Sequence, residues 1–423
     1  MRCNKVLARK RKGNLLIYVC DAVMGTGKST AAINYMNEHS DRPFIYITPR
    51  LTETDRIQDA CPELRFCKPN NFDKEYNHSK IEHTALLIKK KRNIASTHQA
   101  FRGYTPEMLN DIRENGYTLI MDESVDVLES ASITPYDWDM LRQSGLIVPG
   151  SKPNTYTLDE SREYHGVFSR TLKTLQAQEL IVANDKVNGS VFFWTISEEL
   201  LSAFKDVFIL TYLFEGQSIH HFLEMYSLPY ERIGVHRDGG TFRFGEYPGY
   251  VPEYTHNLSD KIYILDYEKM NRIGENKGDL SKTWFERNPE LIEQLRKNVA
   301  NYFTNIHRGD PSGCRMWSTF NQYESSLAGS GYASRFVSFN TKATNDYRDR
   351  TCLAYLINIY MPVGNKTFYQ SNGVKVDDDI YALSIMSQWI WRSAIRDGKP
   401  IDLYLPSSRM REILNNWIKQ LSE

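Results

Sequence analysis

Short apolar runs alternate with stretches of helical periodicity along the first 130 residues. The clearest apolar runs are residues 15–20, 44–48, 93–96 and 118–121. Longer segments separate them, and the first of these is a helical stretch that begins at Lys28. This alternation predicts βαβ units, and therefore a parallel sheet with helices on its faces. Loops at the carboxyl ends of the strands are then expected to carry any ligand.

The rhythm changes between residues 125 and 188, where helix-like and turn-rich pieces replace the alternation. The segment includes the turn-forming run Pro-Gly-Ser-Lys-Pro-Asn at 149–154. We interpret residues 125–188 as a subdomain inserted into the first lobe. Apolar runs resume at 190–196 and 207–212, and the second of these is expected to return to the first sheet.

A second α/β lobe is predicted after a boundary at residues 224/225. Strands are expected at 262–265, 314–318, 335–339, 352–359 and 401–405, and helices at 289–307, 380–396 and 408–421. The fold class is thus α/β, with tandem lobes at 1–224 and 225–423. Between the regular parts lies a glycine-rich and aromatic stretch at 237–254, predicted as a hairpin whose aromatic rings either pack in the core or stack on unpaired bases.

The composition indicates an ordinary globular protein. Of 423 residues, 41% are hydrophobic and 25% are charged. No run approaches the ~18 to 20 apolar residues of a membrane span, and the first residues lack the apolar core of a signal peptide. We therefore expect a soluble, cytoplasmic protein without a membrane partner, located in the host cytoplasm if the protein is viral. Six cysteines without Cys-x-x-Cys spacing predict reduced, mostly buried thiols rather than a zinc ribbon or a disulfide framework.

The formal net charge is zero, which argues against a protein that coats nucleic acid through bulk charge. Basic residues nevertheless cluster at 2–12 and at 89–92. Each cluster is either part of a local basic track or an ordinary solvated surface, and the sequence leaves both interpretations open.

The strongest chemical signal follows the first apolar run. The sequence Asp-Ala-Val-Met-Gly-Thr-Gly-Lys-Ser-Thr at 21–30 combines a strand, a glycine-rich loop, Gly-Lys-Ser and a helix start, as a phosphate-binding loop requires. Backbone N–H groups and the helix N-terminus favour phosphate oxygens, Lys28 is expected to reach the β and γ phosphates, and Ser29 to bind Mg²⁺. The predicted ATP-binding residues are Ala22, Gly25, Thr26, Gly27, Lys28, Ser29 and Thr30.

A second signal lies about 95 residues downstream, where the apolar run 117–121 ends in two carboxylates. Asp122 is expected to complete the Mg²⁺ site together with Ser29. Glu123 is expected to orient and deprotonate the water that attacks the γ phosphate. Acidic pairs also occur at strand ends as helix N-terminal charges, so the preceding phosphate-binding loop is what gives this pair its meaning.

The order of these motifs resembles that of superfamily 2 (DExx-box) helicases and translocases over nearly the whole chain, with Asp-Glu-Ser in the place of the Asp-Glu box. The resemblance implies two RecA-like lobes, and alanine at position 22 is usual in that family. Two short segments of the first lobe look like nucleic-acid-contacting motifs: residues 48–50 look like motif Ia, and residues 96–99 look like the motif that follows it. The place of motif III is occupied by residues 211–216, which lack its Ser-Ala-Thr pattern. In the second lobe, residues 316–320 look like motif IV and residues 343–347 look like motif V.

Residues 388–396, Gln-Trp-Ile-Trp-Arg-Ser-Ala-Ile-Arg, resemble motif VI of that family. The resemblance implies that Gln388 and an arginine face the γ phosphate, where the arginine stabilises charge on the transferred phosphoryl group. Gln388 and Arg392 keep the spacing of the family, whereas Arg396 lies one residue beyond it. Either arginine can therefore be the finger, and a solvated arginine face is the alternative.

The resemblance also implies a nucleic-acid track. Short polar side chains bind phosphate without reading bases, so little sequence specificity is expected. The predicted contacts are Arg50, Thr97, His98, Gln99, Thr319, Thr344 and Asn345. The compact chain further resembles small helicases of tailed bacteriophages and, distantly, origin-binding-type helicases, which favours DNA over RNA, a role in replication or recombination, and replication proteins as partners.

The sequence thus predicts an ATP-dependent and Mg²⁺-dependent helicase or translocase, of unspecified oligomeric state. Two alternatives remain. One is a terminase-type DNA-packaging ATPase, for which residues 377–379 are the carboxylate cluster in the second half. The other is an ATP-switched DNA-binding module that unwinds nothing.

Overall fold

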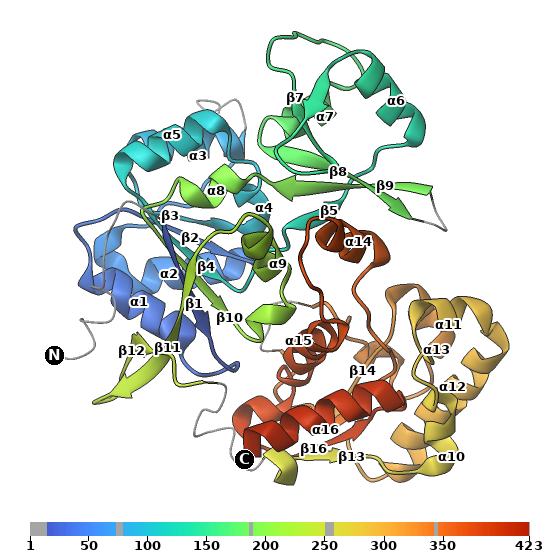
Figure 1. Cartoon of the computed structure of the whole chain (residues 1–423). Helices are drawn as coiled ribbons and strands as arrows, with labels where there is room; N and C mark the ends of the chain where they lie inside the picture. Colours follow the sequence, from blue (N-terminus) through green and yellow to red (C-terminus); the bar gives the residue numbers. More distant parts are fainter. Residues whose placement is uncertain (1–14, 73–78, 186–188, 250–257, 342–345, 423) are drawn as a thin grey trace. The chain divides into compact units, whose positions relative to one another are not determined.

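A computed structural model of the chain describes residues 15–72, 79–185, 189–249, 258–341 and 346–422. These residues form two compact units. The first consists mainly of residues up to 248 together with 362–376, and the second mainly of 249–361 and 377–422. Each unit contains a parallel β-sheet flanked by helices (Figure 1), so the predicted α/β class is confirmed.

The main sheet of the first unit has the strand order β12-β11-β1-β10-β4-β2-β3. Its strands are β1 (Leu16–Asp21), β2 (Phe44–Thr48), β3 (Ile94–Thr97), β4 (Thr118–Asp122), β10 (Asp206–Thr211), β11 (Tyr230–Asp238) and β12 (Thr241–Glu246). All neighbours are parallel except β11 and β12, which form a hairpin. Because this hairpin extends the first sheet, the unit continues to residue 248, beyond the predicted boundary at 224/225.

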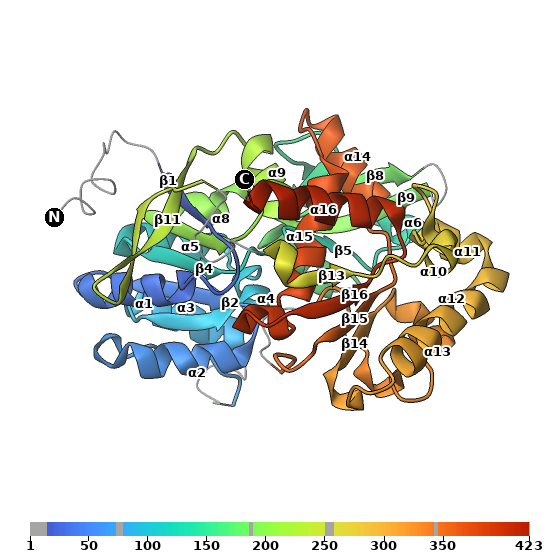
Figure 2. The same ribbon diagram turned by 90° about the horizontal axis from the view of Figure 1, so that it is seen from below.

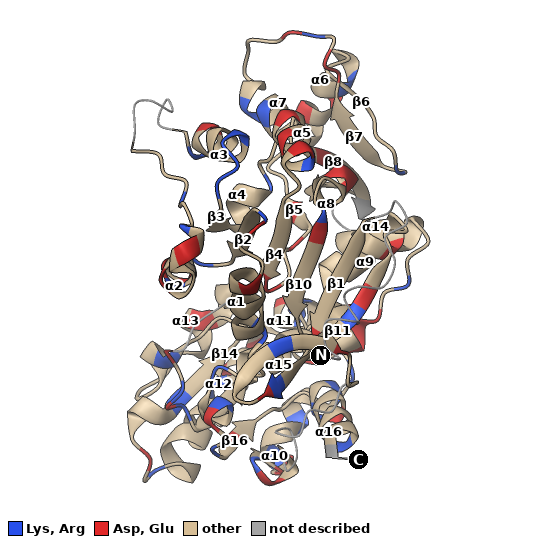
Figure 3. Ribbon diagram, turned by 90° about the vertical axis from the view of Figure 1, so that its left-hand side faces the viewer, with Lys and Arg blue, Asp and Glu red and all other residues tan. Residues whose placement is uncertain are grey.

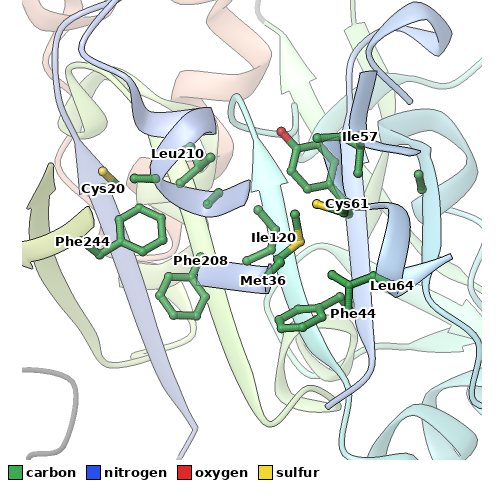
Figure 4. Packing of buried hydrophobic residues seen from close by; sticks show 14 of the residues in the cluster. Cys20, Met36, Phe44, Ile57, Cys61, Leu64, Ile120, Phe208, Leu210 and Phe244 are labelled. Carbon is green, nitrogen blue, oxygen red and sulfur yellow. The ribbon is translucent and has the colours of Figure 1, made fainter. Parts of the chain in front are cut away.

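Helices connect these strands as the alternating pattern predicts. They are α1 (Lys28–Glu38), α2 (Leu51–Ala60), α3 (Lys80–Lys89), α4 (His98–Phe101), α5 (Pro106–Asn115), α8 (Glu198–Ser202) and α9 (Ser218–Met225). α1 turns Ala31, Ala32 and Met36 toward the sheet, where they are buried. Figure 4 shows Met36 among side chains of the central strands, including Ile120 and Phe208. Burial on this scale is the main stabilising contribution to such a layer.

The hairpin residues Phe242 and Phe244 pack against this same core. The Phe244 ring stacks on Phe208 with 5.3 Å between the ring centroids. Asn34 of α1 donates a hydrogen bond of 2.9 Å to the carbonyl oxygen of Phe242. These two aromatic residues therefore pack in the core, which was one of the two roles considered for the stretch 237–254.

The insertion forms a sheet of its own, with the order β5-β9-β8-β7-β6 and antiparallel pairing throughout. Its elements are β5 (Leu128–Ser130), α6 (Pro135–Gln143), β6 (Ile147–Pro149), β7 (Thr155–Leu158), α7 (Ser169–Leu175), β8 (Gln178–Asp185) and β9 (Gly189–Ile196). β9 belongs to this sheet, so the insertion extends beyond its predicted end at 188.

A buried arginine joins the insertion to the segment that follows β3. The Arg102 guanidinium donates to Gln178 Oε1 at 3.1 Å and to the carbonyl oxygen of Trp194 at 3.2 Å. It also forms an ion pair with Glu129 at 3.3 Å. Since a buried charge is tolerated only when it is well paired, Arg102 fixes the base of the insertion.

A late segment of the chain completes the first unit. α14 (Val363–Ser371) packs against β8 and α9 although about 180 residues separate it from β8. Tyr369 forms a hydroxyl–hydroxyl hydrogen bond of 2.8 Å with Ser218. A Cβ atom at Gly364 would lie only 2.8 Å from the Phe193 ring, so glycine permits this close approach.

The second unit is built on the parallel sheet β13-β16-β15-β14. Its elements are β13 (Ile262–Ile264), α10 (Glu268–Asn271), α11 (Lys282–Arg287), α12 (Pro289–Asn301), β14 (Arg315–Ser318), α13 (Glu324–Leu327), β15 (Cys352–Tyr355), α15 (Asp378–Ile390), β16 (Ile401–Tyr404) and α16 (Ser408–Ser422). The ring of Tyr302, the residue directly after α12, packs on Tyr404, and Trp389 of α15 packs on Tyr355. Because Tyr404 is paired with Ala354, Tyr355 lies on the opposite face, so α12 and α15 cover opposite faces (Figure 2).

Three predicted elements of this unit differ in the structure, and the first is the strand predicted at 352–359, which ends at Tyr355. Residues 335–339 form no strand, because Phe336 makes only an isolated bridge to Trp317. The helix predicted at 380–396 ends at Ile390, where the N–H groups of Arg392 and Ser393 bond to carbonyl groups three residues back and the chain turns. After this turn the N–H of Ala394 bonds to the carbonyl oxygen of Arg350.

Candidate functional site

The loop between β1 and α1 has the backbone shape of an anion site. Gly25 and Gly27 have φ angles of 88° and 86°, in the left-handed region that favours glycine. Gly27 precedes α1, and no side chain of the described residues caps the helix N-terminus, so the first-turn N–H groups can bind an anion. Thr26 is buried, and its hydroxyl has no hydrogen-bond partner within the part of the chain that the structure describes.

The register of the sheet brings the two predicted motifs together. Leu210 of β10 is paired with Cys20 on one side and with Asp122 on the other, so β1 and β4 end at the same level. Ser29 Oγ donates a hydrogen bond of 3.0 Å to Asp122 Oδ1. A hydroxyl and a carboxylate in contact form the hard oxygen donor set that Mg²⁺ prefers, so these residues fit the metal.

Lys28 begins α1 and donates from Nζ to the carbonyl oxygen of Ala22. Burial lowers its pKa, while the nearby Asp122, Asp21 and Glu123 carboxylates act in the opposite direction. A cation that has lost much of its hydration and faces carboxylates interacts strongly with an anionic ligand. Of the other loop positions, Ala22 is half-buried, and Gly25 and Thr30 are exposed.

Asp122 is held by a residue that no sequence motif indicates. Tyr46 of β2 is fully buried, and its hydroxyl donates a hydrogen bond of 2.6 Å to Asp122 Oδ2. Burial also raises the pKa of Tyr46 well above its ordinary value, so the phenol remains a neutral donor. Thus Ser29 and Tyr46 each contact one oxygen of Asp122.

Glu123 lies directly after β4 with a φ angle of 61°. Left-handed backbone at a residue other than glycine costs roughly 1 kcal/mol, and such strain is concentrated at functional sites. The next residue, Ser124, donates a hydrogen bond of 2.7 Å to Gln217 Oε1. Gln217 in turn donates to the carbonyl oxygen of Tyr212 at 3.2 Å. The Asp-Glu-Ser segment is thereby joined to the loop after β10, where the counterpart of motif III was expected.

A charged group of residues lies beside the phosphate-loop strand. Asp21, the last residue of β1, is buried, lies 3.5 Å from the Arg232 guanidinium, and accepts a hydrogen bond from the N–H of Phe214. Arg232 also forms an ion pair with Glu215 and a hydrogen bond of 3.3 Å to the Tyr247 hydroxyl. Burial raises the pKa of Asp21 to about 6, although Arg232 acts to lower it.

The predicted nucleic-acid contacts of the first lobe follow neighbouring strands. Thr48 and Thr97 are paired, so Arg50 and Gln99 lie at the same sheet edge, the first half-buried and the second exposed. Thr97 accepts a hydrogen bond of 3.4 Å from the N–H of Ala100 and so caps α4. His98 instead contacts Asp122, since its Nε2 lies 3.0 Å from the carbonyl oxygen of that residue.

Residues 89–92 are a further candidate for binding a phosphate backbone. All four side chains are exposed, and Figure 3 shows the basic colouring at the end of α3. Basic side chains at a helix C-terminus also interact favourably with the helix dipole, so this position alone does not indicate a ligand. The other basic cluster, at 2–12, lies outside the described residues.

The predicted contacts of the second lobe differ in accessibility. Thr319 is fully buried, so its hydroxyl does not reach the surface. Thr344 and Asn345 lie outside the described residues. In the segment that resembles motif VI, Gln388 is half-buried in α15, Arg392 is buried just beyond the helix, and Arg396 is exposed on the short 3-10 helix Ala394–Asp397.

The first unit therefore defines an α/β protein with a glycine-rich loop and an acidic strand end at one edge of a parallel sheet. The chain is 35% identical over 414 residues to the SPbeta prophage-derived uncharacterized protein YonV of Bacillus subtilis (strain 168), an alignment that covers 95% of this chain and 98% of the relative. The chain belongs to the YonV family. Residues 256–418 match the model of the YonV C-terminal Rossmann-like domain.

Solved structures with a similar fold include S. tokodaii Xpd4, which is 12% identical with a TM-score of 0.48, over 98% of this chain and 96% of that one. An XPD helicase structure is 10% identical with a TM-score of 0.40, over 95% of each chain. The prophage origin of the YonV relative agrees with the expected bacteriophage connection. Among the described residues, no helix is long and apolar enough to cross a membrane.

Proposed function

We propose that this protein is an ATP-driven nucleic-acid translocase or helicase that acts on DNA. The observation that carries the proposal is the contact between Ser29 and Asp122 at the open N-terminus of α1. A loop whose glycines have left-handed backbone conformations, a lysine at the helix start and a hydroxyl–carboxylate pair together suit a nucleoside triphosphate with its Mg²⁺. The resemblance of the motif order to superfamily 2 extends this ATPase to a motor.

Each residue of the site has a distinct role in the proposed reaction. The N–H groups around Gly27 and the Lys28 ammonium would bind the phosphates, and Ser29 and Asp122 would hold Mg²⁺, which would supply positive charge against the phosphates. Tyr46 orients Asp122. Glu123 accepts the proton of the attacking water, a role that depends on position more than on a shifted pKa.

Arginine residues of the motif VI segment are proposed to complete the reaction. Arg392 and Arg396 are the two candidates in this segment, and stabilisation of charge that develops on the phosphoryl oxygens is worth several kcal/mol in related chemistry. Binding and release of a phosphate backbone by Arg50, Thr97 and Gln99 would then accompany the hydrolysis cycle. Thr344 and Asn345 remain predictions for the second lobe.

The carboxylate cluster 377–379 does not support the alternative of a packaging ATPase with a nuclease site. The cluster 377–379 has structural partners: Asp377 caps α15 through the N–H groups of Asp379 and Ile380, Asp378 accepts from the N–H of Met361, and Asp379 pairs with Arg409. Carboxylates engaged in this way do not converge on a metal, as a nuclease site requires. An ATP-switched DNA-binding module would hydrolyse ATP as a helicase does but would not separate DNA strands. Strand separation therefore distinguishes the two functions.

The test is steady-state ATP hydrolysis with and without single-stranded DNA, duplex DNA and single-stranded RNA, followed by strand displacement on a forked duplex. Lys28→Ala should abolish turnover by weakening phosphate binding, whereas Glu123→Gln should abolish turnover and retain ATP binding. Polymer-stimulated hydrolysis with displacement supports the motor. Stimulated hydrolysis without displacement supports the switch, and activity retained in both variants would overturn the site.

A further inference from the structure

Three donor groups of different chemistry converge in the second unit, in a cluster that shares no residue with the phosphate-binding loop or the Asp-Glu-Ser segment. They are His307 Nδ1, Asp310 Oδ2 and Cys352 Sγ, and all three atoms lie within 4.8 Å of one another. Cys352 Sγ is 3.4 Å from the His307 nitrogen and 3.3 Å from the Asp310 oxygen. A fourth donor, Cys314 Sγ, lies 3.5 Å from Cys352 Sγ.

The regular structure of this unit fixes where the donors lie. Cys352 begins β15, and Cys314 immediately precedes β14, whose first residue Arg315 is paired with Cys352. The N–H of Thr351 donates to the carbonyl oxygen of Cys314 at 2.9 Å, which closes the two strands at this edge. His307 follows the π-helical turn Tyr302–Ile306 that ends α12. Donors on such supported elements are positioned more narrowly than donors on a free loop.

The three contacts of Cys352 Sγ match those of a tetrahedral metal site, whereas Cys314 Sγ lies outside the group of donor atoms within 4.8 Å of one another and has to move closer to His307 and Asp310 when the ion binds. Zinc bonds to sulfur at ~2.3 Å and to imidazole nitrogen or carboxylate oxygen at ~2.0 Å, so ligand atoms around it lie about 3.3 to 3.8 Å apart. The three contacts of Cys352 Sγ, at 3.3, 3.4 and 3.5 Å, fall within this range. The separation of 2.8 Å between His307 and Asp310 is that of a hydrogen bond, and has to widen by about 0.5 Å when both bind the same ion.

The chemistry of the donor set selects the metal. Thiolate and imidazole favour Zn²⁺ over Mg²⁺ or Ca²⁺, which prefer oxygen ligands. Cys352 is buried and Cys314 and His307 are half-buried, whereas the Asp310 side chain is 45% exposed and gives the ion a path from solvent. A disulfide between the two cysteines is a poor alternative, because 3.5 Å greatly exceeds the ~2.05 Å bond and its formation needs an oxidant.

We propose that His307, Asp310, Cys314 and Cys352 bind one Zn²⁺ as a structural site. Four protein ligands leave no open position for a substrate, which distinguishes a structural site from a catalytic one. Binding displaces the two thiol protons to solvent and leaves two thiolates on the ion. The site ties the end of α12 to the amino-terminal edge of the sheet, opposite the edge at which the strands' carboxyl ends lie.

The test measures metal on the full chain purified without chelator. About one zinc per chain is expected by elemental analysis, and replacement by Co²⁺ should give a thiolate-to-cobalt charge-transfer band with the d–d bands of a tetrahedral ion. Cys352→Ser and Cys314→Ser should lose bound zinc and weaken the charge-transfer band. The matched control is Cys67→Ser, a half-buried thiol of the first unit, which should behave as wild type.

Two outcomes would overturn the proposal. One is a wild-type zinc content no higher than that of the two serine variants, and the other is a Co²⁺ spectrum without thiolate ligation. Since Cys352 is buried, its variant is compared by circular dichroism with the milder Asp310→Asn, which should also weaken zinc binding while it remains folded. None of these readouts depends on ATP hydrolysis, so the zinc site and the motor proposal can fail independently.

Discussion

Replacing Tyr46 by phenylalanine tests the geometry of the proposed magnesium site with a change of one oxygen atom. The Tyr46 hydroxyl donates to Asp122 Oδ2 at 2.6 Å. Hydrogen bonds to a charged group contribute ~1.5 to 3 kcal/mol, and since Asp122 is half-buried, water can replace the lost donor in part. We therefore expect Tyr46→Phe to lower the free energy of unfolding by about 1.5 kcal/mol, near the lower end of this range.

The same substitution should reduce turnover more than it reduces ATP affinity. Asp122 would keep its contact with Ser29 but lose the donor that fixes its second oxygen. Loss of a hydrogen-bond partner that orients a metal ligand typically costs about 10- to 100-fold in metal affinity or activity. Denaturant unfolding measures the effect on stability. The effect on turnover is measured by ATP hydrolysis titrated with Mg²⁺, and the variant should need a higher Mg²⁺ concentration.

Tyr104 supplies a matched control. It is also buried, but within the described part of the chain its hydroxyl has no hydrogen-bond partner. Tyr104→Phe should therefore be neutral or slightly stabilising, and should leave the Mg²⁺ requirement unchanged. Equal effects of the two substitutions on stability and on the Mg²⁺ titration would refute the role assigned to Tyr46.

Three further predictions follow from the described geometry. Burial raises the pKa of Asp21 from 3.8 to about 6, so the stabilisation from its protonated form is present below about pH 4 and is lost as the pH rises through 6. Asp21→Asn should remove a pH dependence of up to about 3 kcal/mol in the free energy of unfolding, measured by denaturant unfolding across this pH range. Gly27→Ala should lose about 1 to 2 kcal/mol of stability from its left-handed φ, and more if the Phe242 ring, 2.5 Å from the new Cβ, does not move; a normal melting temperature would contradict this. Arg392→Ala and Arg396→Ala should lower kcat more than ATP affinity, and an equal loss of both in steady-state kinetics would assign the arginines a structural role.

The sequence predicts the parts of this protein in which local pattern and tertiary role coincide. The runs ending at Asp21 and Asp122 are strands because continuous apolar segments suit a parallel sheet covered on both faces. The start of α1 follows from the glycine loop, since Gly27 adopts a conformation that other residues avoid. Accordingly the contact between Ser29 and Asp122 is one that motif order alone leads us to expect.

Elsewhere the local pattern is insufficient. The insertion reads as helix-like and turn-rich in part because its strands β5 and β6 have three residues each, too few to show alternation, whereas the eight-residue β8 is a strand that the pattern fails to predict. In the sequence, Tyr46 resembles any buried strand residue. Its role as a hydrogen-bond donor to Asp122 follows only from the pairing of β2 with β4. Likewise the spacing of Cys314 and Cys352 carries no motif, because strand pairing and not sequence proximity brings them together.

The return of the chain at α14 has a consequence for how the protein is made. During synthesis, residues 15–248 leave the ribosome long before Tyr369 and Gly364 exist, so the parts of α9 and β9 that these two residues contact stay uncovered in the nascent chain. Domains usually fold in order of synthesis, but here the first unit cannot be finished until most of the second has been translated. A protein fragment that ends at residue 248 should therefore aggregate. A fragment extended with residues 362–376 through a flexible linker should stay soluble.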